Sequence, residues 1–361
     1  MPQAELHHCE IFADDAPSIA HYFVTAYGFT VAGVSGPETG NCDAFSILLI
    51  SGNIRLVVTS ALTPSHPARS FVDKHGYGVR TIAQSVPDAA LAHDTAVSRG
   101  ARSVAAATSY VDQDDARTVI AEVGGAGDLV HRFVEQSSSA WRLPGFRLRE
   151  PVGAGNDLLS IDHFALCVPA GELAATAAFY QEVLGYQKVF EERVVLGDQA
   201  MDSQVVRDAT GSPTLVIAES DPERPAAQVE TFVRLHGGAG VQHVAFSVDD
   251  LAKSARALRA SGVEFLQAPA QYYETLETRI GQIEDDIEDL RALNILVDRD
   301  HDGQLLQIFS TSPHVRRTLF FEVIERRAAT TFGSGNIRAL YEAVRHEQER
   351  LGMSAVPGQE C

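Results

Sequence analysis

The 361-residue sequence predicts an α+β fold of four βαβββ-type modules, which pair two and two into two domains with curved, barrel-like mixed sheets. Two observations predict this fold. Segments of the first half resemble segments of the second half, and the repeated segments start with short apolar strands that precede helical patterns. Four copies of one strand–helix–strands unit also account for the length of the chain.

The first repeated unit is a strand followed by a helix and a glycine. The strands are Leu6–Phe12 and Ile161–Cys167, and the helical patterns after them end at Gly28 and Gly185. In the second copy the apolar residues fall at helical spacing, namely at Leu173, Ala177, Tyr180 and Leu184. Gly185 then fits the left-handed conformation that commonly ends a helix.

The second repeated unit is a strand followed by an alanine-rich helix. Gly78–Asp88 mirrors Gly240–Asp250, and in the second copy Asp249 or Asp250 is the expected N-cap, with Gly262 as the stop. Further apolar stretches supply the remaining strands of the modules: Ile47–Val58, Thr118–Val134, Thr214–Ala218, Leu305–Phe309 and Leu319–Ile324.

The boundary between the two domains is expected in a stretch that contains Ser-Ser-Ser, Pro, Gly and Asn, between Gln136 and Leu158. We place the linker at residues 141–157. Residues 1–140 then form an N-terminal domain with a structural role and no metal. Residues 158–361 form a C-terminal domain, in which the candidate site described below is expected.

Composition and charge exclude several classes of partner. The net charge of −19 and the pI near 5.0 argue against nucleic acid and anionic membranes, both of which select for a basic surface. Four cysteines without Cys-x-x-Cys pairing do not suggest a disulfide framework. No apolar run approaches the roughly 20 residues of a membrane helix, and the N-terminus lacks a signal region. We expect a cytoplasmic protein, and homo-oligomer formation stays open.

Three acid–base residues in apolar strands are the candidate metal ligands. His163 lies in Ile161–Val168, His243 in Val241–Val248, and Glu322 in Leu319–Ile324. A carboxylate in such an apolar run is costly to bury unless it is paired or binds a metal ion. Two histidines and one carboxylate are the ligands of non-haem iron(II) oxygenases, which keep coordination positions open for substrate and oxygen.

The repeat predicts that this site occurs once. Alignment of the halves places His8 opposite His163, Thr81 opposite His243 and Arg132 opposite Glu322. The first half therefore keeps only one of the three ligand types. In the second half, strand alternation puts small residues beside the histidines, namely Ala165, Cys167, Ala245 and Ser247, which leaves room for a cavity.

Several longer motifs resemble the 4-hydroxyphenylpyruvate dioxygenase family of the vicinal-oxygen-chelate superfamily, which also contains 4-hydroxymandelate synthases. The resemblance covers nearly the whole chain and is densest over Ser160–Val344. Its motifs include Ile161–Ala165, Gly240–Phe246, Gln271–Tyr273, Ile295–Asp300, Gly303–Phe309, Leu319–Arg326 and Phe332–Asn336. It implies two vicinal-oxygen-chelate domains, Fe(II) at His163, His243 and Glu322, and 4-hydroxyphenylpyruvate and O2 as substrates.

The resemblance also implies a substrate pocket. The matching positions are Ser203, Thr214, Gln307, Phe332, Asn336 and Ile337. By this resemblance Gln307 could hydrogen-bond the substrate or an iron-bound oxygen, Phe332 could stack on the phenol ring, and Ser203 could hold the phenol hydroxyl. Gln307 could also simply satisfy a backbone group.

Position 337 is expected to select the product. Dioxygenases of the family resemble one another in having Phe after the Gly-Asn pair, whereas this chain has Ile337, as the synthases do. Val216 and Ala218 stand where dioxygenases usually carry Pro and Asn. A smaller side chain would let the substrate ring turn its benzylic carbon toward the iron. The expected reaction is decarboxylation and benzylic hydroxylation, which gives 4-hydroxymandelate and CO2. By analogy with the family, 4-hydroxymandelate is expected to supply the hydroxyphenylglycine units of peptide antibiotics.

Three alternatives remain at this point. The first is a 4-hydroxyphenylpyruvate dioxygenase that forms homogentisate, and the second is a metal-free binding protein of the same fold. The third, a 2-oxoglutarate-dependent oxygenase, usually carries a His-x-Asp motif with a distant His.

The cluster His7-His8-Cys9 does not favour a second metal site, because adjacent strand residues point to opposite faces.

Overall fold

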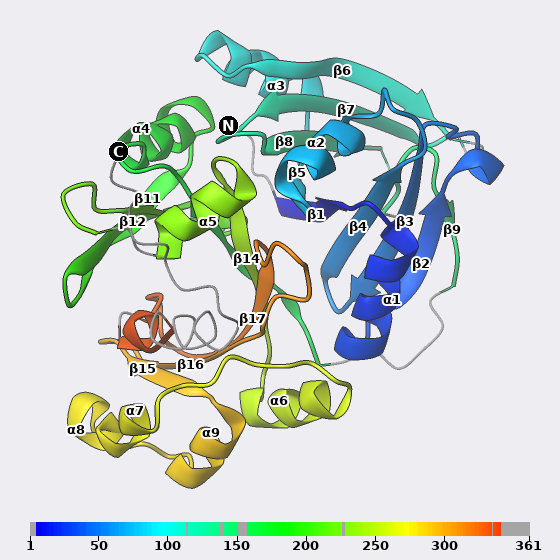
Figure 1. Ribbon diagram of the computed structural model, residues 1–361. Helices are drawn as coiled ribbons and strands as arrows, with labels where there is room; N and C mark the ends of the chain where they lie inside the picture. The colour runs from blue at the N-terminus through cyan, green and yellow to red at the C-terminus, as the bar shows by residue number, and fades with distance from the viewer. Residues whose placement is uncertain are drawn as a thin grey trace, which may run out of the picture.

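The computed structural model describes residues 5–112, 115–137, 141–150, 157–225, 228–333 and 335–340. Two curved β-sheets form its framework (Figure 1). The nine strands of the first sheet are β1 (Glu5–Phe12), β2 (Thr30–Ser35), β3 (Ala44–Ser51), β4 (Ile54–Ala61), β5 (Gly78–Ser85), β6 (Ser103–Val111), β7 (Arg117–Gly124), β8 (Val130–Gln136) and β9 (Arg147–Leu148). Their order in the sheet is β6-β7-β8-β5-β1-β4-β3-β2-β9.

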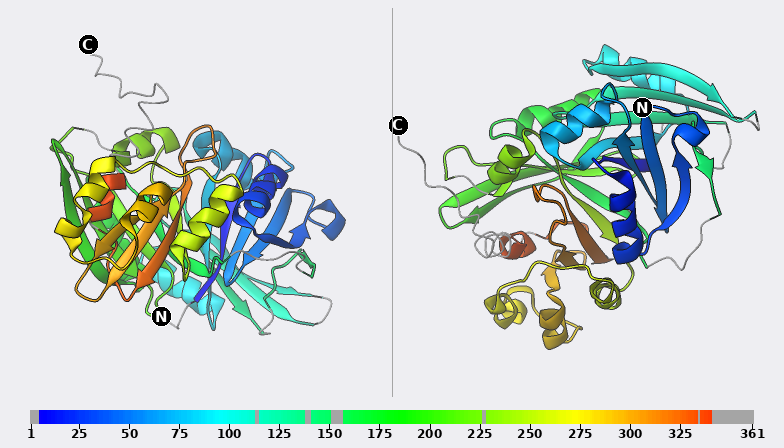
Figure 2. Two further views of the ribbon diagram at one scale, coloured as in Figure 1. Left: turned by 90° about the horizontal axis from the view of Figure 1, so that it is seen from below. Right: turned by 45° about the vertical axis from the view of Figure 1, so that its right-hand side comes forward.

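The second sheet comes from the second half of the chain. Its eight strands are β10 (Ser160–Cys167), β11 (Gln187–Leu196), β12 (Gln199–Arg207), β13 (Thr214–Ser220), β14 (Gly240–Ser247), β15 (Leu296–Arg299), β16 (Gln304–Phe309) and β17 (Phe320–Arg327). They are ordered β11-β12-β13-β10-β14-β17-β16-β15. Figure 2 shows the two halves side by side, the first in blue to cyan and the second in green to red.

Strand pairing confirms the four predicted modules. In each module the first strand pairs in parallel with the last: β1 with β4, β5 with β8, β10 with β13, and β14 with β17. The first strands of two modules then pair antiparallel, β1 with β5 and β10 with β14. Each sheet is therefore mixed and contains two modules.

A helix follows the first strand of each module, as the sequence predicts. These helices are α1 (Ala16–Tyr27), α3 (Ala89–Ser98), α4 (Leu173–Ala178) with the π-helical turn η2 (Phe179–Val183), and α6 (Leu251–Ala260). The Asp250 side chain caps the N-terminus of α6 by accepting a hydrogen bond from the Lys253 N–H. Gly185 has a φ of 79°, which is the predicted left-handed conformation after η2.

The other helices connect or extend the modules. The 3-10 turn η1 (Pro37–Thr39) lies between β2 and β3, α2 (Pro67–His75) and α5 (Gln228–His236) lie between modules, and α7 (Ala270–Glu274), α8 (Leu276–Ile280) and α9 (Ile287–Leu293) come before β15. In Figure 1, α6 to α9 lie on the outer side of β15 to β17. Within the described ranges, no helix is long and apolar enough to cross a membrane.

Part of the predicted linker belongs to the first sheet. β9 lies within residues 141–157 and pairs with β2, with Leu148 opposite Gly33 and Arg147 opposite Val34. Residues 151–156 of the linker lie outside the described residues. The first sheet thus extends beyond residue 140, and the linker boundaries stay a prediction.

An aromatic cluster joins the two halves behind the central strands of the second sheet. Phe23 and Tyr27 of α1 and the neighbouring Phe29 pack against Phe246 of β14 and Phe321 of β17, with ring centroids 5.1 to 6.2 Å apart. All five side chains are fully buried. Because side chains alternate along a strand, this packing fixes the opposite faces of β14 and β17, where residues 243 and 322 project.

Candidate metal centre

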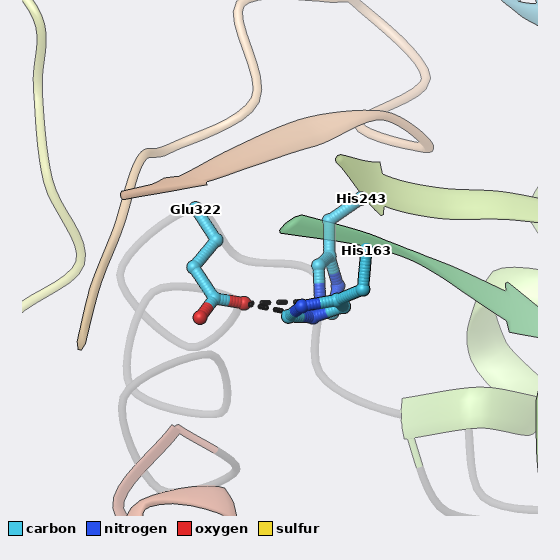
Figure 3. Close-up of side chains that lie close together, drawn as sticks. All are labelled: His163, His243 and Glu322. Carbon is cyan, nitrogen blue, oxygen red and sulfur yellow. Dashed lines mark ion pairs between the residues drawn. The ribbon is translucent and has the colours of Figure 1, made fainter. Parts of the chain in front are cut away.

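The three predicted ligands come together on adjacent central strands. His163 lies on β10, His243 on β14 and Glu322 on β17, which are neighbours in the second sheet. The register places Ala245 opposite both His163 and Glu322 on the flanking strands, and Ala165 opposite His243. Small alanines therefore lie between the ligands. Figure 3 shows the side chains of His163, His243 and Glu322 converging on one point.

The donor atoms fit one metal ion. Glu322 Oε2 lies 3.4 Å from His163 Nε2 and 3.3 Å from His243 Nε2. The ligand atoms of all three residues lie within 4.8 Å of one another. Metal bonds of about 2.1 Å place neighbouring ligands of an octahedral ion about 3 Å apart. The two imidazoles and the carboxylate could therefore hold one ion together, and such a set of three ligands would leave other coordination positions open.

Burial makes the charges of the site interdependent. Burial alone would raise the pKa of Glu322, but the neighbouring His163 and His243 hold that pKa lower, at about 2. Burial opposes a charge on His163, yet Glu322 and Asp162 raise its pKa to about 9. For His243, burial lowers the pKa. The buried carboxylate is thus stabilised by a neighbouring positive charge, which a bound metal ion would supply in place of a protonated His163.

β-Bulges place two further residues beside the histidines. The register of β10 against β14 shifts between Ile161 and His163 and again between Ala165 and Leu166, which leaves Asp162 and Gln242 as extra residues. Asp162 Oδ1 lies 2.8 Å from His163 Nδ1, and Gln242 lines the cavity at the metal centre. Neither residue appeared among the sequence candidates. The sequence feature that could have identified them is that each directly precedes one of the two histidines.

A largely apolar cavity opens at the three ligands. Its polar lining residues besides the ligands are Gln307 and Gln242, which lie near the ligands, and Gln228, the first residue of α5. The other residues that line it are Ala165, Cys167, Met201, Val216, Ala218, Val229, Phe309, Phe332, Ile337 and Leu340. An apolar pocket with a few polar groups and a metal site is typical of a site for a small organic ligand.

A chain of hydrogen bonds fixes the carboxylate ligand from behind. Gln307 Nε2 donates to Glu322 Oε1 over 2.8 Å, and Asn336 Nδ2 donates to Gln307 Oε1, also over 2.8 Å. Tyr272 Oη lies 2.7 Å from Asn336 Oδ1 and can donate to it. The chain directs Oε2 of Glu322 toward the histidines. Asn336 acts through Gln307, since it does not line the cavity.

Three of the six predicted pocket residues line the cavity: Gln307, Phe332 and Ile337. Ile337 packs against the apolar cluster of Cys167, Met201 and Ala218, and the Phe332 ring lies 5.3 Å from the His163 ring in an edge-on arrangement. Val216 and Ala218, the two other selectivity positions, also line it.

Ser203 and Thr214 lie on β12 and β13, and Ser203 is opposite Ala218, which lines the cavity. Ser203 Oγ is 3.4 Å from the Glu192 carbonyl oxygen, and Thr214 Oγ1 accepts a hydrogen bond of 3.0 Å from Arg207 Nε. Both side chains are buried, and neither is among the residues that line the cavity. Their contact with a substrate stays a prediction.

Residues 160–308 match the model of the Glyoxalase/Bleomycin resistance protein/Dioxygenase superfamily. The chain is 30% identical to the 4-hydroxyphenylpyruvate dioxygenase of Yarrowia lipolytica, over 96% of this chain and 92% of that protein. It is 31% identical to the enzyme of the same name from Dictyostelium discoideum, over 96% and 98%.

A solved structure is also similar over nearly the full length. It is a triple-substituted 4-hydroxymandelate synthase from Streptomyces coelicolor, which is 39% identical and superposes with a TM-score of 0.88. The similarity covers 96% of this chain and all of that chain.

Proposed function

Because this chain belongs to the 4-hydroxyphenylpyruvate dioxygenase family, we propose that it is an iron(II)-dependent dioxygenase that converts 4-hydroxyphenylpyruvate and O2 into 4-hydroxymandelate and CO2. The observation that carries the proposal is that His163, His243 and Glu322 converge in an apolar cavity whose wall contains Ile337. Decarboxylation and benzylic hydroxylation together account for both atoms of O2.

The proposed metal ion is iron(II), held by His163 Nε2, His243 Nε2 and Glu322 Oε2. When bound, iron(II) supplies the redox chemistry and the open coordination positions of a two-histidine, one-carboxylate site. The chain holds these three donors in place before substrate arrives. Gln307 keeps one oxygen of Glu322 occupied, so that the other oxygen faces the histidines.

Apolar walls would hold the aromatic end of the substrate. Phe332 offers a ring edge-on to His163, close enough to the ligands for a phenol ring to pack against it. Met201, Val216 and Val229 complete an apolar surface on other elements. Gln242 and Gln307 are the polar side chains near the ligands and are suited to the polar end of a 2-oxo acid.

Ile337 would set which carbon is oxidised. Its side chain is half-buried and packs against Cys167, Met201 and Ala218. An aliphatic side chain here occupies less of the cavity than a phenyl ring, so the substrate ring has room to turn and to present its benzylic carbon. Product choice is then a matter of orientation, because reacting atoms must be held in a near-attack geometry.

The deciding experiment is a product assay. Protein loaded anaerobically with iron(II) is mixed with 4-hydroxyphenylpyruvate and oxygen, and the products are identified by chromatography and mass spectrometry. We expect 4-hydroxymandelate and an equal amount of CO2. Homogentisate as main product would instead assign the activity named for the relatives from Yarrowia and Dictyostelium. Absence of iron binding and of oxygen uptake would favour a binding protein.

We also propose that the protein works in the cytoplasm. Cys9, Cys42 and Cys167 are all free thiols, which fits a reducing compartment. Fractionation of the source cells, followed by detection of the protein, tests this location.

A further inference from the structure

We propose that Arg326 is a positioning residue that couples the ligand His163 to the cavity wall at Phe332, so that metal affinity and the placement of the substrate ring depend on one guanidinium. The metal part of this inference needs only the three ligands. The substrate part rests on the proposed function.

The coupling begins at the β-bulge in β10. Asp162 is the extra residue there, and its carboxylate turns to the Nδ1 side of the His163 ring, at 2.8 Å. A carboxylate at Nδ1 favours the tautomer in which Nδ1 carries the proton and Nε2 offers its lone pair. In this orientation Nε2 faces Glu322, as a metal ligand must.

Arg326 holds that carboxylate with two parallel hydrogen bonds. Its Nε donates to Asp162 Oδ2 over 2.7 Å, and its Nη2 donates to Asp162 Oδ1 over 2.9 Å. Both side chains are mostly buried, with 22% and 14% of their surfaces exposed. Arg326 lies four residues after Glu322 on β17 and so projects from the same face of that strand. One strand therefore supplies a ligand and the support of a second ligand.

The remaining nitrogen of Arg326 binds the loop that carries Phe332. Nη1 donates to the carbonyl oxygens of Thr331 over 2.6 Å and Ala329 over 3.3 Å. The guanidinium carbon also lies 5.0 Å from the centre of the Phe332 ring, in cation–π range. The same planar group thus fixes the support of His163 and the ring that lines the cavity.

A second contact holds this loop from the other side. Asp300 Oδ2 accepts hydrogen bonds from the backbone N–H groups of Thr330 and Thr331, at 2.7 and 2.9 Å. The loop therefore has little freedom to move away from Arg326. A change in Arg326 would be transmitted to His163 and Phe332 rather than absorbed by the loop.

The support is specific to one of the two histidines. In the part of the chain that the structure describes, His243 Nδ1 is buried and has no hydrogen-bond partner. The His243 ring is instead stacked on Phe320 at 4.9 Å. The proposed effect of Arg326 should therefore reach the metal through His163.

The first test measures metal binding without turnover. Asp162→Asn, Arg326→Lys and Arg326→Met are compared with the unaltered protein by chelator competition for Fe(II), and by the visible absorption spectrum of bound Co(II). We expect a 10- to 100-fold weaker Fe(II) affinity and an altered Co(II) spectrum, the usual range for a residue that orients a metal ligand. Arg326→Lys should not rescue, because an ammonium cannot reproduce the planar set of donors.

The neighbouring Arg327 provides the matched control. It donates to Asp285 and Glu325, away from the ligands, with one hydrogen bond of 3.0 Å to Asp285. Arg327→Lys should lower the melting temperature at most, with Fe(II) affinity within about twofold of the unaltered protein. Unchanged metal affinity in both Asp162→Asn and Arg326→Lys would overturn the proposal, as would an equal loss in Arg327→Lys. If Arg326→Met does not fold, the comparison of Asp162→Asn and Arg326→Lys with Arg327→Lys still tests the proposal.

The second test separates the two arms of the coupling. At saturating Fe(II), Arg326→Lys should raise the KM for 4-hydroxyphenylpyruvate several-fold, because the Phe332 loop loses its contacts. Asp162→Asn keeps those contacts and should change KM less. An equal KM in both variants would contradict the proposed effect of Arg326 on substrate placement through Phe332. If the unaltered protein does not oxidise 4-hydroxyphenylpyruvate, the proposed function fails, and the metal-binding test still decides whether Arg326 positions His163.

Discussion

Strands β1, β5 and β8 of the first half are arranged like β10, β14 and β17 of the second, so equivalent residues can be compared. His8 lies opposite Ala83, and Ala83 lies opposite Arg132. In the second half His163 lies opposite Ala245, and Ala245 lies opposite Glu322. The equivalence of His8 with His163 and of Arg132 with Glu322 is therefore confirmed.

The β-bulge before the histidine is also repeated. The register of β1 shifts between Leu6 and His8, which leaves His7 as the extra residue, as Asp162 is in β10. His7 Nδ1 lies 2.6 Å from His8 Nδ1, so each histidine has a partner at Nδ1 from the residue before it. The two halves thus share the strands, the bulge and the oriented imidazole.

The halves differ in how positive charge is supplied. Arg132 lies 3.1 Å from His8 Nε2 and forms ion pairs of 2.9 Å with Glu10 and 2.6 Å with Glu122. Burial keeps the pKa of His8 well below its ordinary value, so His8 is neutral and can accept from Arg132. In the first half the guanidinium of Arg132 supplies the positive charge next to His8 and Glu10. In the second half the equivalent position holds the carboxylate of Glu322, so a bound metal ion would have to supply the positive charge.

Removal of the carboxylate ligand should have the largest effect. Glu322→Gln keeps the shape of the side chain but removes its charge, so metal affinity and oxygen uptake should both fall by more than the roughly 100-fold range of supporting residues. Metal content after dialysis and an oxygen electrode measure the two losses. Retained iron at the original stoichiometry would refute the assignment of Glu322 as a ligand.

Removal of the Arg132 guanidinium should lower the stability of the protein and leave its metal affinity unchanged. Arg132→Met leaves Glu10 and Glu122 without their buried partner, which should cost about 3 kcal/mol of unfolding free energy. Urea denaturation measures this loss, and the iron content of the folded variant should not change. A variant that loses iron before it unfolds would contradict the division of roles between the halves.

Ile337→Phe should change the product rather than the rate of substrate consumption. The added ring would restrict the substrate in the cavity and shift the product ratio toward homogentisate by several-fold. Product analysis checks this, with Ile337→Leu as the control that stays aliphatic. An unchanged ratio in Ile337→Phe would remove the selectivity argument from this position.

The smallest effect is expected from Thr81→His. This change gives the first half a second histidine at the position equivalent to His243, but Arg132 still lies at the position of the carboxylate. The metal content per chain should therefore equal that of the unaltered protein, as measured by atomic emission. An additional bound ion would show that Arg132 does not exclude metal.

Strand patterns explain why much of the site could be predicted from the sequence. His163, His243 and Glu322 stood out as acid–base residues in apolar strands, and alternation within a strand put Ala165 and Cys167 on the face of His163, where both line the cavity. Phe332 and Ile337 were found through motifs, and the structure places both at the cavity.

Contacts that depend on bulges and on sheet curvature could not be predicted. Regular alternation puts Asp162 on the face opposite His163, and only the bulge brings the two side chains together. Ser203 and Thr214 match pocket motifs, and their contact with a substrate stays a prediction. Arg326 acts across a loop, and no spacing in the sequence indicates that contact.

The aromatic cluster between the halves limits how this enzyme can be divided. Phe246 and Phe321 are adjacent in sequence to Ala245 and Glu322, and their rings are covered by Phe23, Tyr27 and Phe29 of the first half. A fragment with residues 158–361 would contain every proposed ligand but would expose this apolar surface to water. We therefore expect residues 158–361 alone to be less stable than the whole chain. The first half thus covers the apolar side of the strands that carry the three proposed ligands.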